Sequence, residues 1–214
     1  MKKLGPILVL SLAPVITWAN IIPTGTTITG AGPIYTWTYN LQLSSDQNVN
    51  SGLPPTDILV PPDNIDFSGF FTIYDFAGYQ VDSCDGPIGW QCTAQLLGFT
   101  PSDVVPIDNP TLYNLTWAYT SGSDILGQPD GVNLGDFSAQ SIYDTITKVS
   151  YTARGIANSG AQEGTIADNV GNTDGPMGVP EPPLVLLLGL GLGILTTTIK
   201  ATKRSRLGGG QTSL

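Results

Sequence analysis

A strict alternation of apolar and polar side chains over residues 34–43 is the feature that most limits the fold. This run, Ile-Tyr-Thr-Trp-Thr-Tyr-Asn-Leu-Gln-Leu, places an aromatic residue or leucine at every second position from Tyr35 onward. Successive side chains of a β-strand point to opposite faces, so a period of two predicts a strand with one buried and one solvent face. Residues 113–119 repeat the pattern. We therefore expect a sheet whose apolar face packs against a second layer.

The rest of the central region predicts the same fold class. Residues 70–76 are a continuous aromatic and β-branched run, typical of a strand buried on both faces. Glycine and proline, 26 and 17 residues of 214, punctuate the chain, and no part of 20–178 combines helical periodicity with sufficient length. Shorter strand candidates are 90–96, 136–142 and 145–153. We predict a mainly β fold with a single antiparallel β-sandwich domain.

The predicted sandwich covers residues 20–156. Residues 157–178 hold few large apolar side chains. They predict a long loop with one edge strand at most, or a stalk that leads to a membrane.

Residues 1–19 have the layout of a secretory signal peptide. Lys2 and Lys3 precede an apolar run from Leu4 to Ile16, and Thr17 and Ala19 place small residues at positions −3 and −1 of a cut before Asn20. As a helix the apolar run would measure only about 20 Å, which disfavours a membrane anchor because the hydrocarbon core is ~30 Å thick. The expected partners are therefore the Sec machinery and signal peptidase.

The opposite end of the chain predicts a transmembrane helix over residues 184–199. Its sixteen apolar or uncharged residues span about 24 Å, enough to cross a bilayer if flanking residues enter the interface. A basic stop-transfer cluster follows: Lys200, Lys203, Arg204 and Arg206. By the positive-inside rule this cluster stays in the cytoplasm, which leaves residues 20–180 outside the membrane. Residues 207–214 form a short tail.

Charge and composition exclude several classes of function. All 17 acidic residues lie from Asp46 to Glu181, where the only cations are Lys148 and Arg154, so this region carries a net charge of −15 and repels the phosphates of nucleic acids. Histidine is absent, which removes every imidazole-dependent mechanism and every histidine-ligated zinc site. A glycosidase with two carboxylates remains conceivable chemically, but no pair stands out by spacing. We expect a protein that is not an enzyme.

The C-terminal region resembles the PEP-CTERM sorting signal. Val179, Pro180, Glu181 and Pro182 match its sorting motif, and the apolar helix and basic cluster complete it over residues 179–206. Residues 70–76, 114–120 and 134–139 also look like stretches of uncharacterised PEP-CTERM ectodomains. The resemblance implies export by a Gram-negative bacterium, recognition and cleavage by an exosortase, and a role near exopolysaccharide or in biofilm. It implies no activity for the ectodomain.

Three further features bear on binding. Cys84 and Cys92 are the only cysteines, and in an oxidising compartment we expect them to form a disulfide. Trp90, inside that loop, is the tryptophan that we expect at the surface, whereas the alternating patterns place Trp37 and Trp117 in the core. Four acidic clusters could supply ligands to a structural calcium ion: Asp63 and Asp66; Asp82 and Asp85; Asp130, Asn133 and Asp136; Asp168, Asn172 and Asp174. None of them fits the EF-hand pattern, and the same residue types form β-turns, so the sequence allows a calcium site without requiring one. We otherwise expect no cofactor and no metal.

The sequence therefore favours an exported structural protein of the envelope or the exopolysaccharide matrix. An adhesin or carbohydrate-binding module is the second hypothesis, and an envelope hydrolase is the third.

Overall fold

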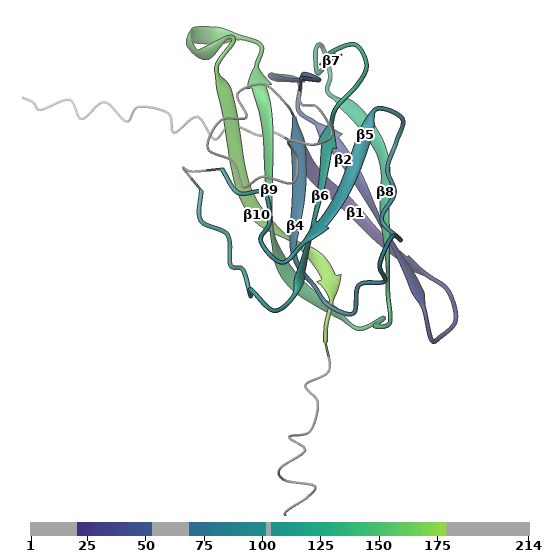
Figure 1. Cartoon of the computed structure of the whole chain (residues 1–214). Coiled ribbons are helices and arrows are strands. Elements are labelled where there is room, and N and C mark those ends of the chain that lie inside the picture. The colour runs from purple at the N-terminus through teal and green to yellow at the C-terminus, as the bar shows by residue number, and fades with distance from the viewer. Residues whose placement is uncertain (1–20, 53–68, 102–103, 179–214) are drawn as a thin grey trace, which may run out of the picture. The chain divides into compact units, whose positions relative to one another are not determined.

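The computed structural model describes residues 21–52, 69–101 and 104–178 (Figure 1). Within these ranges the chain is mainly β-structure and contains no α-helix. The strands are β1 (Ile21–Thr29), β2 (Tyr35–Leu43), β3 (Gln47–Val49), β4 (Phe70–Phe76), β5 (Trp90–Gln95), β6 (Tyr113–Tyr119), β7 (Ile125–Leu126), β8 (Val132–Ser141), β9 (Ile146–Ala157) and β10 (Ile166–Pro176). One short 3-10 turn, Gly160–Gln162, lies between β9 and β10.

The strands form two antiparallel sheets, which is consistent with the predicted β-sandwich. The smaller sheet has the order β1-β2-β8. The larger sheet has the order β5-β6-β4-β9-β3-β7, and β10 pairs with β9. Aromatic side chains join the sheets: Trp37 of β2 meets the Phe76 ring edge-on at 6.3 Å, and Phe137 of β8 meets Trp117 of β6 at 5.9 Å. The core therefore lies between the two sheets.

The alternation in β2 is confirmed. Its inward-facing residues Trp37, Tyr39, Leu41 and Leu43 are completely buried, whereas the residues between them are half-buried or exposed. Burying side chains of this size provides the main driving force for sheet packing, at about 25 cal/mol per Å² of apolar surface.

The prediction that β4 is buried on both faces is confirmed, but β6 differs from its predicted one-sided pattern. Asn114, Thr116 and Ala118, expected to face solvent, are buried as well. The reason is that the chain after β5 folds back over the outer face of the larger sheet. There Phe99 packs against Phe70 with ring centroids 4.3 Å apart, and its carbonyl oxygen accepts hydrogen bonds from hydroxyl groups of the sheet.

For residues 157–178 the sequence predicts a stalk, or a long loop with one edge strand at most, and such a strand is present: β10, residues 166–176, pairs with β9 along its full length. The stalk alternative is wrong for these residues. Large apolar side chains are unnecessary here, because the backbone ladder and small residues hold the strand. A Cβ atom at Gly171 would lie 2.7 Å from the Tyr151 ring, and one at Gly175 would lie 2.6 Å from Val149, so both glycines leave room for side chains of β9. The compact unit consequently extends to Gly178 rather than ending at 156.

The terminal predictions lie outside the described residues: the signal peptide 1–19, the sorting signal 179–206 and its helix 184–199. Among the residues that the structure does describe, no helix has the length and apolar character needed to cross a membrane.

Candidate functional site

The predicted disulfide between Cys84 and Cys92 is confirmed. It ties the segment after β4 to strand β5. The same segment is also bound to β8, because Asp85 and Ser138 exchange backbone hydrogen bonds of 2.8 and 2.9 Å and Tyr79 forms a bridge with Ser141. Residues 79–85 are thus fixed between two strands of different sheets.

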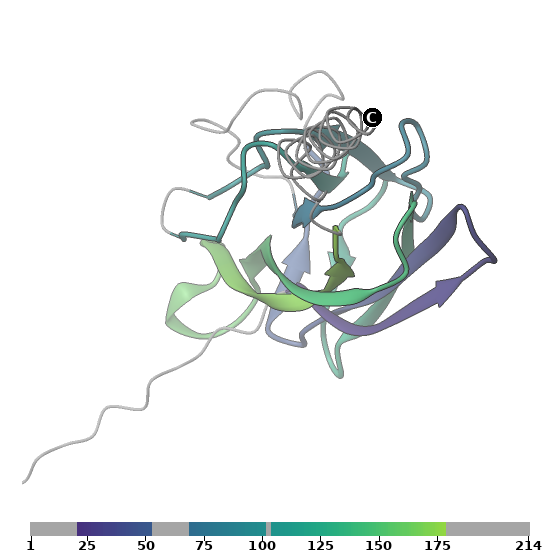
Figure 2. The same cartoon turned by 90° about the horizontal axis from the view of Figure 1, so that it is seen from below.

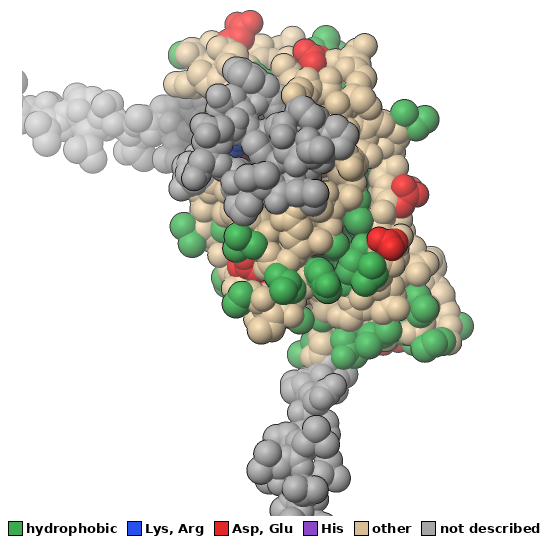
Figure 3. Space-filling view, viewed as in Figure 1, with side chains coloured by type: hydrophobic (Ala, Val, Ile, Leu, Met, Phe, Trp, Pro, Cys, Tyr) green, Lys and Arg blue, Asp and Glu red, His purple; other side chains and the backbone are tan. Residues whose placement is uncertain are grey.

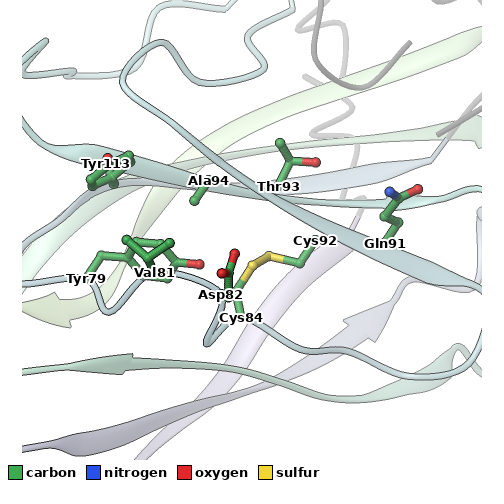
Figure 4. Close-up of a pocket in the computed structure, with 9 residues that line it drawn as sticks. All are labelled: Tyr79, Val81, Asp82, Cys84, Gln91, Cys92, Thr93, Ala94 and Tyr113. Carbon is green, nitrogen blue, oxygen red and sulfur yellow. A yellow bond between two sulfur atoms is a disulfide. The ribbon is translucent and has the colours of Figure 1, made fainter. Parts of the chain in front are cut away.

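A groove of about 500 Å³ lies between this segment and β5 (Figure 4). Tyr79, Val81, Asp82 and Cys84 line one side. Residues 91–94 of β5 line the other, with Tyr113 of β6 at one end. In Figure 4 the disulfide spans the gap between the two sides. A covalent bond therefore joins the two walls of the groove.

The groove combines aromatic rings with hydrogen-bonding groups. The rings of Tyr79 and Tyr113 have centroids 5.4 Å apart, and Tyr113 is 38% exposed. Asp82, Gln91 and Thr93 add a carboxylate, an amide and a hydroxyl to the lining. A site with apolar ring faces and a few polar groups can hold a ligand that has both kinds of surface.

Asp82 has a backbone conformation that side chains rarely adopt. Its φ angle is +61°, in the left-handed region, where aspartate is better tolerated than most residues because its short polar side chain can interact locally. The exposed Asp82 side chain lines the open groove rather than the core. This turn therefore leaves the Asp82 carboxylate exposed at the groove.

Exposed apolar side chains occur in the groove lining and directly after β5. Val81 is 71% exposed, and Leu96 and Leu97, directly after β5, are also exposed. Figure 3 shows apolar side chains gathered on the lower half of this face of the molecule. Grouped apolar surface of this kind often marks a contact site.

A second polar centre, missed by sequence reasoning, surrounds Asp75. Asn114 accepts a hydrogen bond from the Asp75 backbone N–H at 2.8 Å and donates one to Asp108 at 3.0 Å. Asp75 also has a left-handed φ of +56°, at an irregularity in the pairing of β4 with β6. Burial raises the pKa of the Asp75 carboxyl. The Asn109 backbone N–H donates a hydrogen bond to this carboxyl and lowers its pKa, whereas the nearby Asp108 carboxylate raises its pKa. This centre fastens the loop before β6 to the bulge in β4.

The sequence contains no local signal for this centre, because Asp75 and Asp108 lie on different elements far apart in the chain. Only the left-handed turn at Asp75 brings its side chain to that loop.

The expectation of a surface-exposed Trp90 is wrong. Its side chain is 9% exposed and packs edge-on against Phe137 at 5.0 Å and against Tyr119 at 5.4 Å. The pairing explains this: Trp90 lies opposite Tyr119, so it shares the inward face of the sheet with Tyr119. The tyrosines of the groove, rather than Trp90, are the aromatic residues available to a ligand.

The acidic clusters considered for calcium are mostly engaged within the protein. Asp168 pairs with Arg154, and Asp174 with Lys148. Asp136 accepts a hydrogen bond from Asn40 at 3.0 Å. In the described part of the chain no group of three or more cysteine, aspartate or glutamate side chains is placed to hold a metal ion, whereas Asp63 and Asp66 lie outside it.

The sorting-motif residues and the basic cluster also lie outside the described residues: Val179, Pro180, Glu181, Pro182, Lys200, Lys203, Arg204 and Arg206.

No protein-family model matches the chain, and no curated protein matches it.

Proposed function

We propose that this chain is an exported, membrane-anchored surface protein of the PEP-CTERM type, processed by an exosortase. It serves as a structural component of the envelope or of an exopolysaccharide or biofilm matrix. The observation that carries the proposal is the order Pro180-Glu181-Pro182, apolar segment, basic cluster behind an acidic β-domain. Because proline disrupts a helix, we expect this motif to be extended next to the predicted span, in a form that a protease can bind.

The disulfide supports export. Bonds of this kind form and persist outside the cytoplasm and are rare within it. The Cys84–Cys92 bond also joins two segments of one small domain, and disulfides commonly stabilise small extracellular domains in this way.

Processing can be tested by replacing the motif. In the bacterium that encodes the chain, the triple variant Pro180→Ala, Glu181→Gln, Pro182→Ala should accumulate at the membrane, while the wild-type chain is shortened and released. A matched control, Pro54→Ala with Pro55→Ala, changes a proline pair elsewhere and should be processed like the wild type. Fractionation and immunoblotting provide the measurement. A product confined to the cytosol would remove the export proposal, and equal processing of both variants would remove the exosortase.

The proposed role is not catalytic. Purified full-length protein should therefore turn over no substrate in a screen of glycosides and esters. Turnover that disappears in Asp75→Asn or Asp108→Asn would instead assign hydrolysis to the carboxylates around Asn114.

The groove favours a second function, the binding of a saccharide. Sugars present flat C–H faces that stack on aromatic rings and hydroxyl groups that bond to carboxylates and amides. Tyr79, Tyr113, Asp82 and Gln91 supply these groups along one groove. This candidate adds an exopolysaccharide contact to the structural role.

Glycan binding by the full chain in detergent tests this second function. Tyr113→Ala and Asp82→Asn should each weaken binding about tenfold, equivalent to ~1.4 kcal/mol. Val170→Ala, an exposed apolar change on β10, is the control and should bind normally. Binding that survives both groove variants would place the saccharide elsewhere.

A further inference from the structure

Strand β1 has an open edge. It pairs with β2 on one side and ends the smaller sheet, because that sheet has the order β1-β2-β8. Among the described residues, the only hydrogen bond to the β1 backbone from outside this pairing goes from Asn169 Nδ2 to the Ile21 carbonyl oxygen, at 3.4 Å. Figures 1 and 2 both show the end of β1 that leads into the β1–β2 turn projecting from the rest of the domain. Its backbone from Thr24 to Thr29 is therefore available to another strand.

The space beside this edge is also open. Thr24, Gly25, Thr27 and Thr29 are exposed. A Cβ atom placed on Gly25 would meet no atom within 4 Å. Proline residues and β-bulges usually prevent strands from pairing at a sheet edge. In β1 these features occur only at the start of the strand, where Pro23 lies next to an irregularity in the register.

Two other edges are protected. The free side of β8 is covered by residues 79–85, which form backbone bonds to Ser138 and Gln140. Strand β10 carries Asp174, whose side chain is 31% exposed. Charged side chains on an edge discourage pairing with a second strand. The edge of β1 has neither protection over residues 24–29.

The charge distribution indicates what kind of strand can approach. No charged residue occurs between Lys3 and Asp46, so the whole β1–β2 hairpin is neutral. Residues 46–181 carry a net charge of −15, which makes two copies of the domain repel each other over most of their surface. At the neutral hairpin a second copy can approach without placing carboxylates opposite carboxylates.

We propose that β1 of one copy pairs antiparallel with β1 of a second copy, so that two three-stranded sheets become one six-stranded sheet. Antiparallel pairing of a strand with itself is two-fold symmetric, so the contact closes as a dimer. It also places threonines of one copy beside threonines of the other, and Thr–Thr pairs across strands are favourable. The proposal rests on the edge alone and does not depend on the proposed export or processing.

The contact is small. Six residues of one strand edge bury much less than the ~1,200 Å² at which specific stable interfaces begin. We therefore expect weak association in dilute solution and strong association where copies are concentrated, as on a shared surface.

Cysteine cross-linking of the full chain in detergent tests the pairing. The described cysteines are both in the disulfide, so a single introduced thiol is the reactive group there. In two-fold pairing one residue lies opposite its own copy, within the Cα separation of ~4.4–6.8 Å that a disulfide spans. Of Thr24→Cys, Thr26→Cys, Thr27→Cys and Thr29→Cys, at least one should yield covalent dimer about fivefold above controls.

Two controls separate edge pairing from random collision. Gln42→Cys lies exposed on the interior strand β2, and Asn172→Cys lies exposed on β10. Adding Gly25→Lys to the best cross-linking variant should reduce its dimer to the control level, because the lysines of the two copies then repel each other, while Gln42→Lys should not. Circular dichroism confirms that each variant is folded. β1 thiols that cross-link no better than the controls, or only to a different protein, would overturn the proposal.

Discussion

Loss of the Cys84–Cys92 disulfide should destabilise the domain by about 2.5 kcal/mol. The two cysteines are eight residues apart. Closing a loop of this size removes an entropy of about 8.3 cal/mol/K from the unfolded chain, which corresponds to about 2.5 kcal/mol at 25 °C. For a domain of this size, that change lowers the midpoint of thermal unfolding by roughly 5–10 °C.

Urea unfolding of the full chain in detergent, followed by tryptophan fluorescence, measures this loss. The signal reports the core because Trp37, Trp90 and Trp117 are all buried. The double variant Cys84→Ser, Cys92→Ser removes the bond but also changes two side chains that pack partly against the core. Reduction of the wild-type protein removes the bond alone and should produce nearly the same loss.

The two measurements together can refute the reasoning. A loss below about 0.5 kcal/mol in both would mean that the cross-link does not restrict the unfolded chain as the loop-entropy argument requires. A large loss in the double variant with none on reduction would assign the stabilisation to core contacts instead.

Three further predictions concern single residues, each measured by urea unfolding of the full chain. Trp90→Ala should cost about 3–5 kcal/mol because it removes a buried ring from contact with Phe137; a cost below 1 kcal/mol would return Trp90 to the surface. Asp168→Ala should cost about 3–5 kcal/mol because it removes one side of a buried ion pair, in which the side chains of Arg154 and Asp168 are 12% and 4% exposed. An unchanged midpoint of unfolding would show that other contacts of Arg154 suffice. Asp75→Asn should stabilise the protein at pH 7 but not at pH 3. The folded-state pKa of Asp75 is raised, so the stability contributed by its protonated form is present below the unfolded pKa of about 3.9 and is lost as pH rises through the folded pKa. Asparagine does not ionise and has no such loss. An equal effect at both pH values would contradict this cause.

The central strands could be predicted because their side chains report burial directly. In β2 the strict alternation identified the inward face, and the four inward residues from Trp37 to Leu43 are buried as expected. In β4 the unbroken apolar run indicated burial on both faces. The disulfide followed from the number of cysteines and the expected compartment.

The positions and lengths of the outer strands escaped prediction because tertiary contacts, rather than side-chain pattern, define them. Strand β10 is held by its ladder to β9 and by the Arg154–Asp168 ion pair, and neither leaves a local pattern. Strand β1 was not predicted either, since its Pro23 and Gly25 interrupt the alternation. The burial of Thr116 depends on the Phe99 segment folding over the larger sheet.

The groove could not be predicted from the sequence. Asp82 and Tyr113 are far apart in the chain, and the segment 79–85 becomes a wall only through its bridges to β8 and its disulfide. Trp90 looked like an exposed loop residue until its pairing with Tyr119 placed it on the inward face.

The intact mass of the protein recovered from its own bacterium tests the central claim most directly. We predict a chain that begins at Asn20, ends near Pro180–Pro182 once processed, and is lighter by the two hydrogens lost in the disulfide. A mass that matches the entire 214-residue chain with both thiols reduced would contradict the proposed export and processing.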